Sequence, residues 1–233
     1  TDDMIEDSVV PLLPMLREQA SVMIARALDA AVINGDDTAT HMDSDVTAAQ
    51  DFRKAWDGLR KLGENNEITQ AEPISPDHIP EMLLEMGKFG TNVDQCVLFI
   101  AVQEYLKLLS AADLKTVQNI GLDRATLRTG VIDRIYGVDI VVTEEVRRDL
   151  NVAGVHDAVT TNNTIEILAR RDRFWLGVRH DIRLEQVRAP QALANWIQAD
   201  LRCDWQAIDK NDTDNVFAAG PDIPVALSVD VTS

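Results

Sequence analysis

Apolar residues recur at helical spacing through the first stretch of the chain, from Met4 to Asn34. The positions that form this stripe are Ile5, Val9, Leu12, Leu16, Met23, Ala27 and Ala31. Residues at such intervals share one face of a helix, so we expect much of this helix to pack against other structure. Pro11 and Pro14 predict a kink or a later start, and the Asn-Gly step at Asn34 predicts the end. A continuous helix of this length spans roughly 40 Å, so we interpret it as a strut.

Two short helices are expected after a polar loop. Thr47 and Gln50 have the spacing of a capping box, which predicts a helix that ends at Gly63. Its apolar side would contain Phe52, Trp56, Leu59 and Leu62. A second helix is predicted to start at Ser75-Pro76 or at Asp77 and to be ended by Gly87 and Gly90. Its apolar side would contain Ile79, Met82, Leu83 and Met86.

The middle of the chain predicts a buried strand, a helix and a hairpin. Gln95–Ile100 is a continuous apolar run, which is typical of a strand buried on both faces. Val102–Leu109 follows it with the period of a helix. The inward residues of that helix would be Tyr105, Leu106 and Leu109. Val131–Tyr136 and Val138–Val142 flank Gly137 and predict two strands joined by a tight turn.

The C-terminal third reads as strands. Ile165–Ile167 begins one strand, and the apolar positions of Phe174–Val178 and of Ile182–Leu184 indicate two more. Apolar and polar residues then alternate through Ile197–Trp205, which predicts a long strand with one buried face. A last apolar piece is Val216–Ala219. Helices followed by strands of this kind predict an α+β fold.

Composition and charge limit the classes of function that we expect for this chain. The 233 residues are 45% hydrophobic and 26% charged, which is ordinary for a globular protein, and the net charge is −17. Such a chain repels phosphate backbones, so we do not expect its body to bind nucleic acid. No apolar run approaches the length of a membrane span. Cys96 and Cys203 are expected to be buried free thiols in a reducing compartment.

A search for chemistry finds no catalytic signature. The chain contains no glycine-rich phosphate loop, no nucleophile elbow and no HExxH pair. The run from His41 to Asp45 offers one imidazole and two carboxylates, a weak cation site that we interpret as a solvated loop. Asp36-Asp37 and Glu144-Glu145 are interpreted as surface charge. We therefore predict no catalytic, cofactor-binding or metal-binding residue.

Tryptophan and methionine positions suggest where the protein packs and where it meets partners. Trp56 and Trp205 lie in periodic patterns and are predicted to pack in the core. Trp175 and Trp196 have weaker periodic context, and tryptophan is enriched at interface hot spots, so these two are our interface candidates. The methionines on the helical stripes are expected to fill the core. They are Met15, Met23, Met82 and Met86.

The order of these segments resembles the major capsid proteins of tailed bacteriophages, including prophage copies, which share the Hong Kong 97-type fold. The matching phrases are ALDAAVINGDD at Ala27–Asp37, QCVLFIAVQEYLKLL at Gln95–Leu109, the glycine-flanked turn at Gly130–Val142, FWLGVRHDIRLE at Phe174–Glu185 and the strand Leu201–Trp205. No single phrase is specific. Their order along most of the chain carries the resemblance.

The resemblance implies a division of the chain. Residues 1–41 and 156–211 would form a peripheral domain of spine helix and long strands, and residues 42–155 and 212–233 an axial domain. Family members carry an N-terminal arm and an extended loop ahead of the spine helix. The chain begins at Thr1, close to that helix, so we expect this portion to have been removed or left out. No cross-linking residue is assigned.

The resemblance also implies a function, which is a structural role in the virion and no enzyme activity. Pentamers and hexamers of the protein would close an icosahedral head around DNA, after assembly in the host cytoplasm with scaffold and portal proteins. No cofactor or membrane is implied. An acidic shell protein does not adhere to its packaged polyanion, which agrees with the net charge of −17. Two other interpretations stay open: an encapsulin-type compartment with protein cargo, and a soluble α+β module that binds a small ligand.

Overall fold

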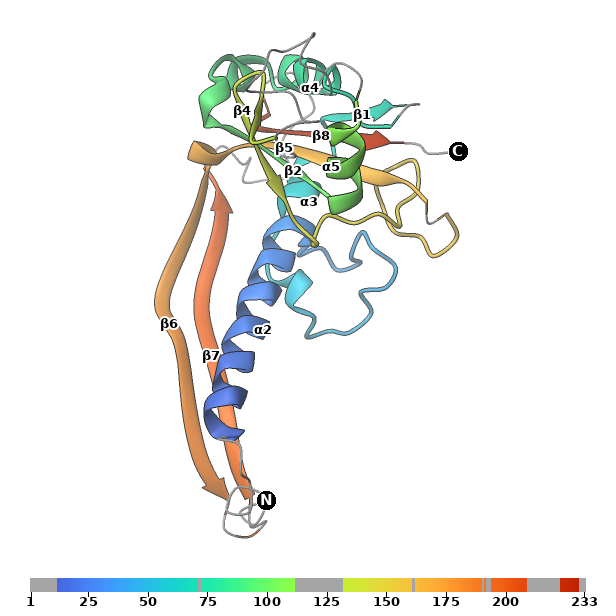
Figure 1. Cartoon of the computed structure of the whole chain (residues 1–233). Coiled ribbons are helices and arrows are strands. Elements are labelled where there is room, and N and C mark those ends of the chain that lie inside the picture. The colour runs from blue at the N-terminus through green and yellow to red at the C-terminus, as the bar shows by residue number, and fades with distance from the viewer. Residues whose placement is uncertain are drawn as a thin grey trace.

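The structure is a computed structural model, and it describes residues 12–70, 73–111, 132–160, 162–189, 191, 194–208 and 223–230. Three sequence predictions fall outside these ranges: the start of the first helix before residue 12, the beginning of the hairpin at Val131, and the apolar piece Val216–Ala219. The described chain forms a layered unit with a sheet at its centre, and a long helix and a hairpin that project from it (Figure 1).

A six-stranded mixed sheet organises the layered unit. Its strands in spatial order are β1 (Glu67–Gln70), β8 (Val225–Asp230), β5 (Thr164–Arg170), β2 (Cys96–Ile100), β4 (Val138–Val142) and β3 (Arg134–Ile135). β1 runs parallel to β8 and β2 runs parallel to β4, while the other neighbouring strands are antiparallel. The two middle strands, β5 and β2, come from segments about seventy residues apart, so the sheet joins distant parts of the chain.

Helices cover both faces of this sheet. The helices and short 3-10 turns are α3 (Leu59–Gly63), α4 (His78–Glu85), α5 (Val102–Leu109), η1 (Phe52–Lys54), η2 (Gly87–Thr91), η3 (Val93–Gln95) and η4 (Arg171–Arg173). On one face, Ile165 and Ile167 of β5 pack with Leu62 of α3. On the other, Leu168 packs with residues of α4 and α5 such as Met82 and Leu108. Successive side chains of β5 point to opposite faces of the sheet, so this strand contributes residues to the core on each side.

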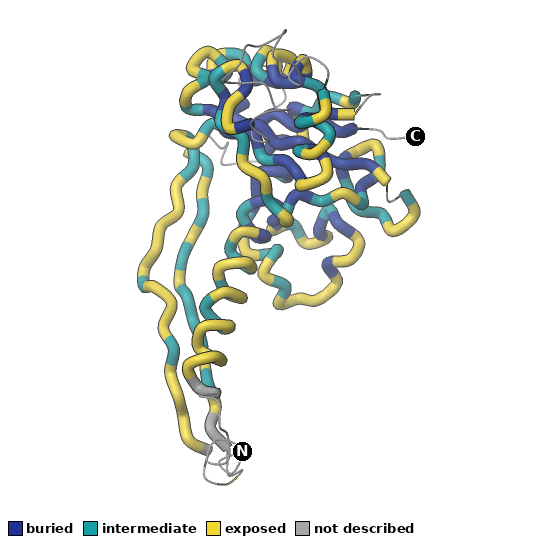
Figure 2. The backbone as a smooth tube through the Cα atoms, viewed as in Figure 1, coloured by how far each residue is buried: buried dark blue, intermediate teal, exposed yellow. Residues whose placement is uncertain are grey.

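The projecting part consists of α2 (Leu12–Asn34) and the antiparallel hairpin of β6 (Phe174–Ala189) and β7 (Ala194–Ala207). At 1.5 Å per residue the 23 residues of α2 span ~35 Å. The 16 residues of β6 span ~50 Å at the rise of a strand. Figure 2 shows that burial is concentrated in the layered unit, whereas the helix and hairpin are mostly exposed.

Several local predictions are confirmed. β2, α5 and β4 have the bounds or nearly the bounds that their patterns predict, and Met82 and Met86 are fully buried. The turn between β3 and β4 has positive φ at both Tyr136 and Gly137, the conformation of a two-residue hairpin turn. β7 shows the expected alternation: Ile197, for example, is half-buried and its neighbour Gln198 is exposed.

Other predictions are wrong. The capping-box helix forms only in its last part. Residues 47–51 are irregular, Asp51 caps the turn η1 and Phe52 is exposed, whereas α3 ends at Gly63 as predicted with Leu59 and Leu62 buried. Leu106 of α5 is exposed rather than inward. Strands β1 and β8 were not predicted at all. The two segments expected within β6 form one strand with register shifts between Val178 and Arg183.

One strand of the segment 156–211, which was expected in the peripheral domain, lies in the six-stranded sheet. β5 was assigned with the hairpin, but it pairs with β2 and β8 inside the six-stranded sheet. The side chains explain this, since β5 is buried from Thr164 to Ala169 and β6 is exposed along most of its length. The hairpin strands therefore begin after η4, at Phe174.

Gly35 ends α2 for a reason that differs from the predicted one. Its φ is not positive, so the helix does not end in a left-handed residue. A side chain at this position would instead collide with the backbone carbonyls of Ala31 and Trp56, and the Gly35 carbonyl accepts a hydrogen bond from the Gly58 amide at 2.9 Å. Glycine allows the helix end and the segment before α3 to approach closely.

Candidate interaction surface and buried polar sites

The first two-thirds of α2 carry an apolar face that nothing in the described chain covers. Its members are Met15, Leu16, Val22 and Met23, which recur seven residues apart and are all exposed, Met23 to 70%. The prediction that Met15 and Met23 fill the core is therefore wrong for the protomer. The stripe from Leu16 to Met23 was expected to be buried and is also open.

A second side of the same helix does pack. Ala20, Ile24 and Ala27 are half-buried, and α2 contacts both hairpin strands. The last turn enters the core, where Ala31 and Ile33 are buried. A helix that is apolar on more than one side is typical of one that is surrounded in its functional state. The protomer alone surrounds only one of these sides.

Among the large apolar side chains that the structure describes on the hairpin, the two tryptophans selected from the sequence are the most exposed. Trp175 is exposed to 71% and Trp196 to 67%. By contrast, Trp205 is half-buried and stacks on Phe174 with ring centroids 5.2 Å apart. Trp56 is half-buried, and its indole nitrogen donates to the Ala31 carbonyl at 3.1 Å.

Register places both exposed tryptophans on one face of the hairpin. Trp175 lies opposite Gln206 and Trp196 lies opposite Val187. Gln206 and Trp196 are an even number of residues apart on β7, and directly paired residues point to the same side. The face that carries them is opposite to the half-buried face of Ile197 and Trp205. Ten residues of β7 separate the two positions, or ~33 Å, so they form two distant anchors on one surface.

A pocket lies where the hairpin joins the layered unit. Its lining includes Trp56, Trp175 and Trp205 together with Asp37, Asp57 and Asp204. The three aspartates make it acidic, and it opens beside the hairpin face described above. This pocket would be the ligand site of a binding module, and no convergent set of catalytic groups lines it.

Arg60 is fully buried and occupies the position where a cation was considered. Its guanidinium donates to both oxygens of Asp43 at 2.9 and 3.0 Å, to the Asn34 side-chain oxygen at 2.8 Å and to the Gly154 carbonyl at 2.7 Å. Asp43 also accepts from the His156 amide at 3.0 Å. Burial raises the pKa of Asp43, but hydrogen bonds and charge from Arg60 outweigh it and lower that pKa to about 2.

The loop around Asp43 is therefore not the solvated loop that the sequence suggested. His41 and Asp43 are buried, and burial lowers the pKa of His41. Asp36 was expected as surface charge but is buried too, because its carboxylate accepts from the amides of Thr38 at 3.0 Å and Met42 at 2.6 Å. The carboxylates of this loop bind the protein's own arginine and amides.

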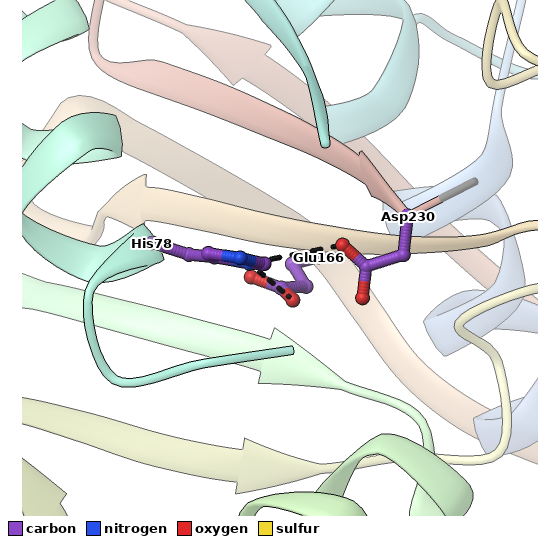
Figure 3. A group of neighbouring side chains, drawn as sticks. All are labelled: His78, Glu166 and Asp230. Carbon is purple, nitrogen blue, oxygen red and sulfur yellow. Dashed lines mark hydrogen bonds and ion pairs between the residues drawn. The ribbon is translucent and has the colours of Figure 1, made fainter. Parts of the chain in front are cut away.

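A second buried polar group combines His78 at the start of α4, Glu166 on β5 and Asp230 at the end of β8 (Figure 3). The His78 Nδ1 atom lies 3.3 Å from Glu166 Oε1 and 3.7 Å from Asp230 Oδ1. Burial raises the pKa of both carboxyl groups. The charge of Glu166 raises the pKa of Asp230 further, whereas a hydrogen bond from protonated Asp230 lowers the pKa of Glu166. This group faces the core from three elements.

Sequence reasoning missed this group. Its members are 88 and 64 residues apart in sequence, and no motif spacing links them. The one local signal is that Thr164 and Glu166 alternate with Ile165 and Ile167 in a strand that is buried on both faces. A carboxylate on such a strand is rare without a partner.

Comparison with known proteins gives one significant match to a curated sequence. The major capsid protein of Escherichia phage T5 is 27% identical over 144 residues, which cover 62% of this chain and 30% of that protein. The match thus spans less than a third of the length of the curated relative. No family model matches the chain.

Solved structures match over nearly the whole chain. The capsid of an empty GTA particle, computed with C5 symmetry, gives a TM-score of 0.63 at 14% identity and covers all of this chain and 70% of the other. A structure from Gordonia phage Cozz gives a TM-score of 0.58 at 15% sequence identity, and the match covers 99% of this chain and 67% of the other. A structure from Mycobacterium phage Adephagia gives a TM-score of 0.56 at 16% identity, and the match covers 99% of this chain and 69% of the other.

The chain has the Hong Kong 97-type capsid fold. The resemblance drawn from the ordered sequence phrases is confirmed, as is the α+β class. Within this capsid fold, the exposed faces of α2 and of the hairpin belong to the part of the chain that projects furthest from the sheet (Figure 1). Among the described residues, no helix is both long and apolar enough to cross a membrane.

Proposed function

We propose that this chain is part of a major capsid protein that assembles, through pentamers and hexamers, into the icosahedral head of a tailed phage or prophage. The role is structural rather than enzymatic. The observation that carries the proposal is the projecting helix and hairpin, which expose apolar side chains on two surfaces of a fold shared with capsid chains.

The energetic argument starts from the exposed side chains. Met15, Leu16, Val22 and Met23 on α2, with Trp175, Val187 and Trp196 on the hairpin, all lie open in the protomer. Burial of one such side chain is worth about 1.5–3 kcal/mol. Surfaces of this kind on a thin projecting element mark contacts with other chains, because the element cannot fold back to bury them. Repeated copies of one chain supply a partner for each surface.

We assign the six-stranded unit to the axial domain, and α2 with the β6–β7 hairpin to the spine and peripheral domain. The sheet unit is compact and buries its own core, which suits the part of a subunit that meets its neighbours around a five-fold or six-fold axis. The projecting unit suits contacts between subunits along their edges. Trp175 and Trp196 are the proposed anchors of those contacts.

The net charge of −17 supports enclosure of DNA without adhesion to it. Scaffold and portal proteins are the further partners that such a head requires, and we place assembly in the host cytoplasm and the finished protein in the virion. These assignments follow from the proposed role.

The test is assembly of the protein expressed from its complete reading frame, followed by light scattering and negative-stain microscopy. Closed shells, or rings with five-fold or six-fold symmetry, are expected. A monodisperse monomer or dimer under conditions that favour assembly would refute the proposal and favour the ligand-binding module. Shells that copurify with a specific protein cargo would favour the encapsulin-type compartment instead.

A matched pair of variants ties assembly to the proposed surface. Trp196→Ser removes an exposed anchor, whereas Gln198→Ser changes an exposed polar residue on the same face of β7, two positions away. We expect the first variant to remain folded and to lose assembly, and the second to assemble like the unmodified protein. Equal assembly by both variants would exclude Trp196 from the contact.

A further inference from the structure

The face of the sheet that α4 and α5 cover ends in a buried polar patch. Glu166 on β5 lies directly opposite Ser228 on β8, and Thr164 lies opposite Asp230. Opposite residues of an antiparallel pair point to the same side, so these four side chains share one face. His78 reaches the patch from the start of α4 (Figure 3). All of these residues are buried, and Glu166, Ser228 and Asp230 have no exposed surface.

Negative charge in this patch exceeds the positive charge that the described chain supplies. Glu104 of α5 is fully buried and acts on both Glu166 and Asp230, raising the pKa of each. The charge of the Lys107 ammonium group lowers the pKa of Glu166, but this ammonium group already pairs with Glu104, with 2.9 Å between Nζ and Oε1. Three carboxylates therefore face one partly exposed lysine and the imidazole of His78, whose charge acts on Asp230. Buried charges normally have partners or coordinate metals.

Several oxygens in the patch also lack hydrogen bonds. Within the described part of the chain, Glu166 Oε2, both carboxylate oxygens of Asp230 and the hydroxyl of Ser228 have no hydrogen-bond partner, and the nearest basic group to Asp230 is His78, 3.7 Å from its Oδ1 atom. Ser228 is an independent observation, because it is neutral, lies opposite Glu166 on the same face of the sheet and still has a hydroxyl without a hydrogen bond. Each such buried group costs about 1–3 kcal/mol when nothing binds it.

The geometry points to a bound cation. We propose that His78, Glu166 and Asp230 bind a divalent transition-metal ion of the zinc class, which joins α4 to strands β5 and β8. One imidazole nitrogen with two carboxylates is a donor set that zinc accepts. Four ligands at 2.0–2.1 Å around a tetrahedral centre lie about 3.4 Å apart. The observed separations from His78 Nδ1, 3.3 and 3.7 Å, are close to this value.

The competing occupant is a proton. Glu166 and Asp230 can share one hydrogen between their carboxyl groups, which would relieve the repulsion without any metal. A shared proton leaves Ser228 Oγ unexplained, whereas a metal ion with an open fourth position accepts a hydroxyl or water there. The two occupants differ in measurable metal content.

The experiment counts zinc in the protein. The full chain, produced in zinc-supplemented medium and purified without chelator, is expected to contain about one zinc ion per chain, and removal of zinc is expected to lower the melting temperature. Glu166→Gln and Asp230→Asn keep side-chain size and remove a ligand charge, so both should bind zinc more than about tenfold less tightly. Each also removes a buried charge, so the variants are expected to fold.

The control is Asp37→Asn, which alters the other group of neighbouring acids, Asp36, Asp37 and Asp57. Its zinc content should equal that of the unmodified protein. Replacement of zinc by Co²⁺ should give the strong visible absorption of a tetrahedral centre, which is weakened in His78→Gln. The proposal is overturned if the unmodified protein contains no zinc, or if folded Glu166→Gln retains the full amount. Metal content is counted whether or not chains assemble, so this result is separate from the capsid proposal.

Discussion

Asp43 gives the sharpest test of what holds the layered unit to the base of α2. The variant Asp43→Asn keeps the size of the side chain and removes its charge. Arg60 then remains fully buried without a counter-ion, although it still donates to Asn34 and to the Gly154 carbonyl. The loss of one partner of a buried pair costs about 3–5 kcal/mol.

The magnitude can be checked from the pKa of Asp43. That pKa falls from 3.8 to about 2 in the folded protein, and at 1.36 kcal/mol per pKa unit the fall corresponds to about 2 kcal/mol. This free energy is the difference between charged and protonated Asp43, and we take it as the lower bound of the stability that Asp43→Asn loses. We expect a loss of about 3–5 kcal/mol, a large part of a typical folding free energy of about 5–15 kcal/mol.

The assay is urea unfolding followed by tryptophan fluorescence near neutral pH. Asp149→Asn serves as the control, because Asp149 pairs with Arg147 at 2.7 Å but is substantially exposed. Exposed pairs contribute about 0–1 kcal/mol, so this variant should unfold close to the unmodified protein. A loss below about 1 kcal/mol in Asp43→Asn, or an equal loss in both variants, would refute the reasoning.

The same pair predicts acid sensitivity. The folded-state pKa of Asp43 lies below its unfolded value, so its contribution is present above pH 3.8 and is lost as pH falls toward about 2. The melting temperature of the unmodified protein should therefore drop over this interval more steeply than that of Asp43→Asn. Parallel curves for the two proteins would contradict the assigned role of the ion pair.

Three further substitutions should distinguish residues that stabilise the fold from residues that serve assembly. Met82→Ala removes a fully buried side chain between α4 and the sheet and should cost about 2–5 kcal/mol in urea unfolding. Gly35→Ala places a methyl group against backbone carbonyls and should lower the melting temperature clearly, whereas an unchanged value would mean that the helix end moves freely. Met23→Glu should leave protomer unfolding within about 0.5 kcal/mol, because Met23 is exposed, yet it should reduce assembly measured by light scattering.

Local sequence patterns predicted the elements whose own periodicity determines which of their faces are buried. The continuous apolar run of β2 predicted burial on both faces, and the alternation of β7 predicted that one face is less exposed than the other. The structure agrees with both predictions. The glycine at 137 fixed the turn between β3 and β4. In these cases the physical cause lies within a few residues of the element it shapes.

What the sequence missed depends on partners far along the chain. β8 carries Ser228 and Asp230, which break its apolar run, and only pairing with β5 and β1 explains why such a segment is a central strand. Asp43 looked solvated because Arg60 approaches it only after the chain has folded. The apolar faces of α2 were predicted correctly as apolar, but periodicity does not say whether the covering surface comes from the same chain.

The two buried ionic groups lead to opposite conclusions about ligands. Around Asp43, the charges of Arg60 and Arg147 and the amide of His156 use the carboxylate's oxygens, so this carboxylate has its partners within the chain. Around Asp230, neither carboxylate oxygen has a hydrogen bond from the described residues, and the His78 Nδ1 atom lies 3.7 Å from Oδ1. Desolvation acts on both groups, and the oxygens without hydrogen bonds around Asp230 are the ones that the proposed cation would bind. A cation there would connect α4 to the neighbouring strands β5 and β8, and would stiffen the layered unit.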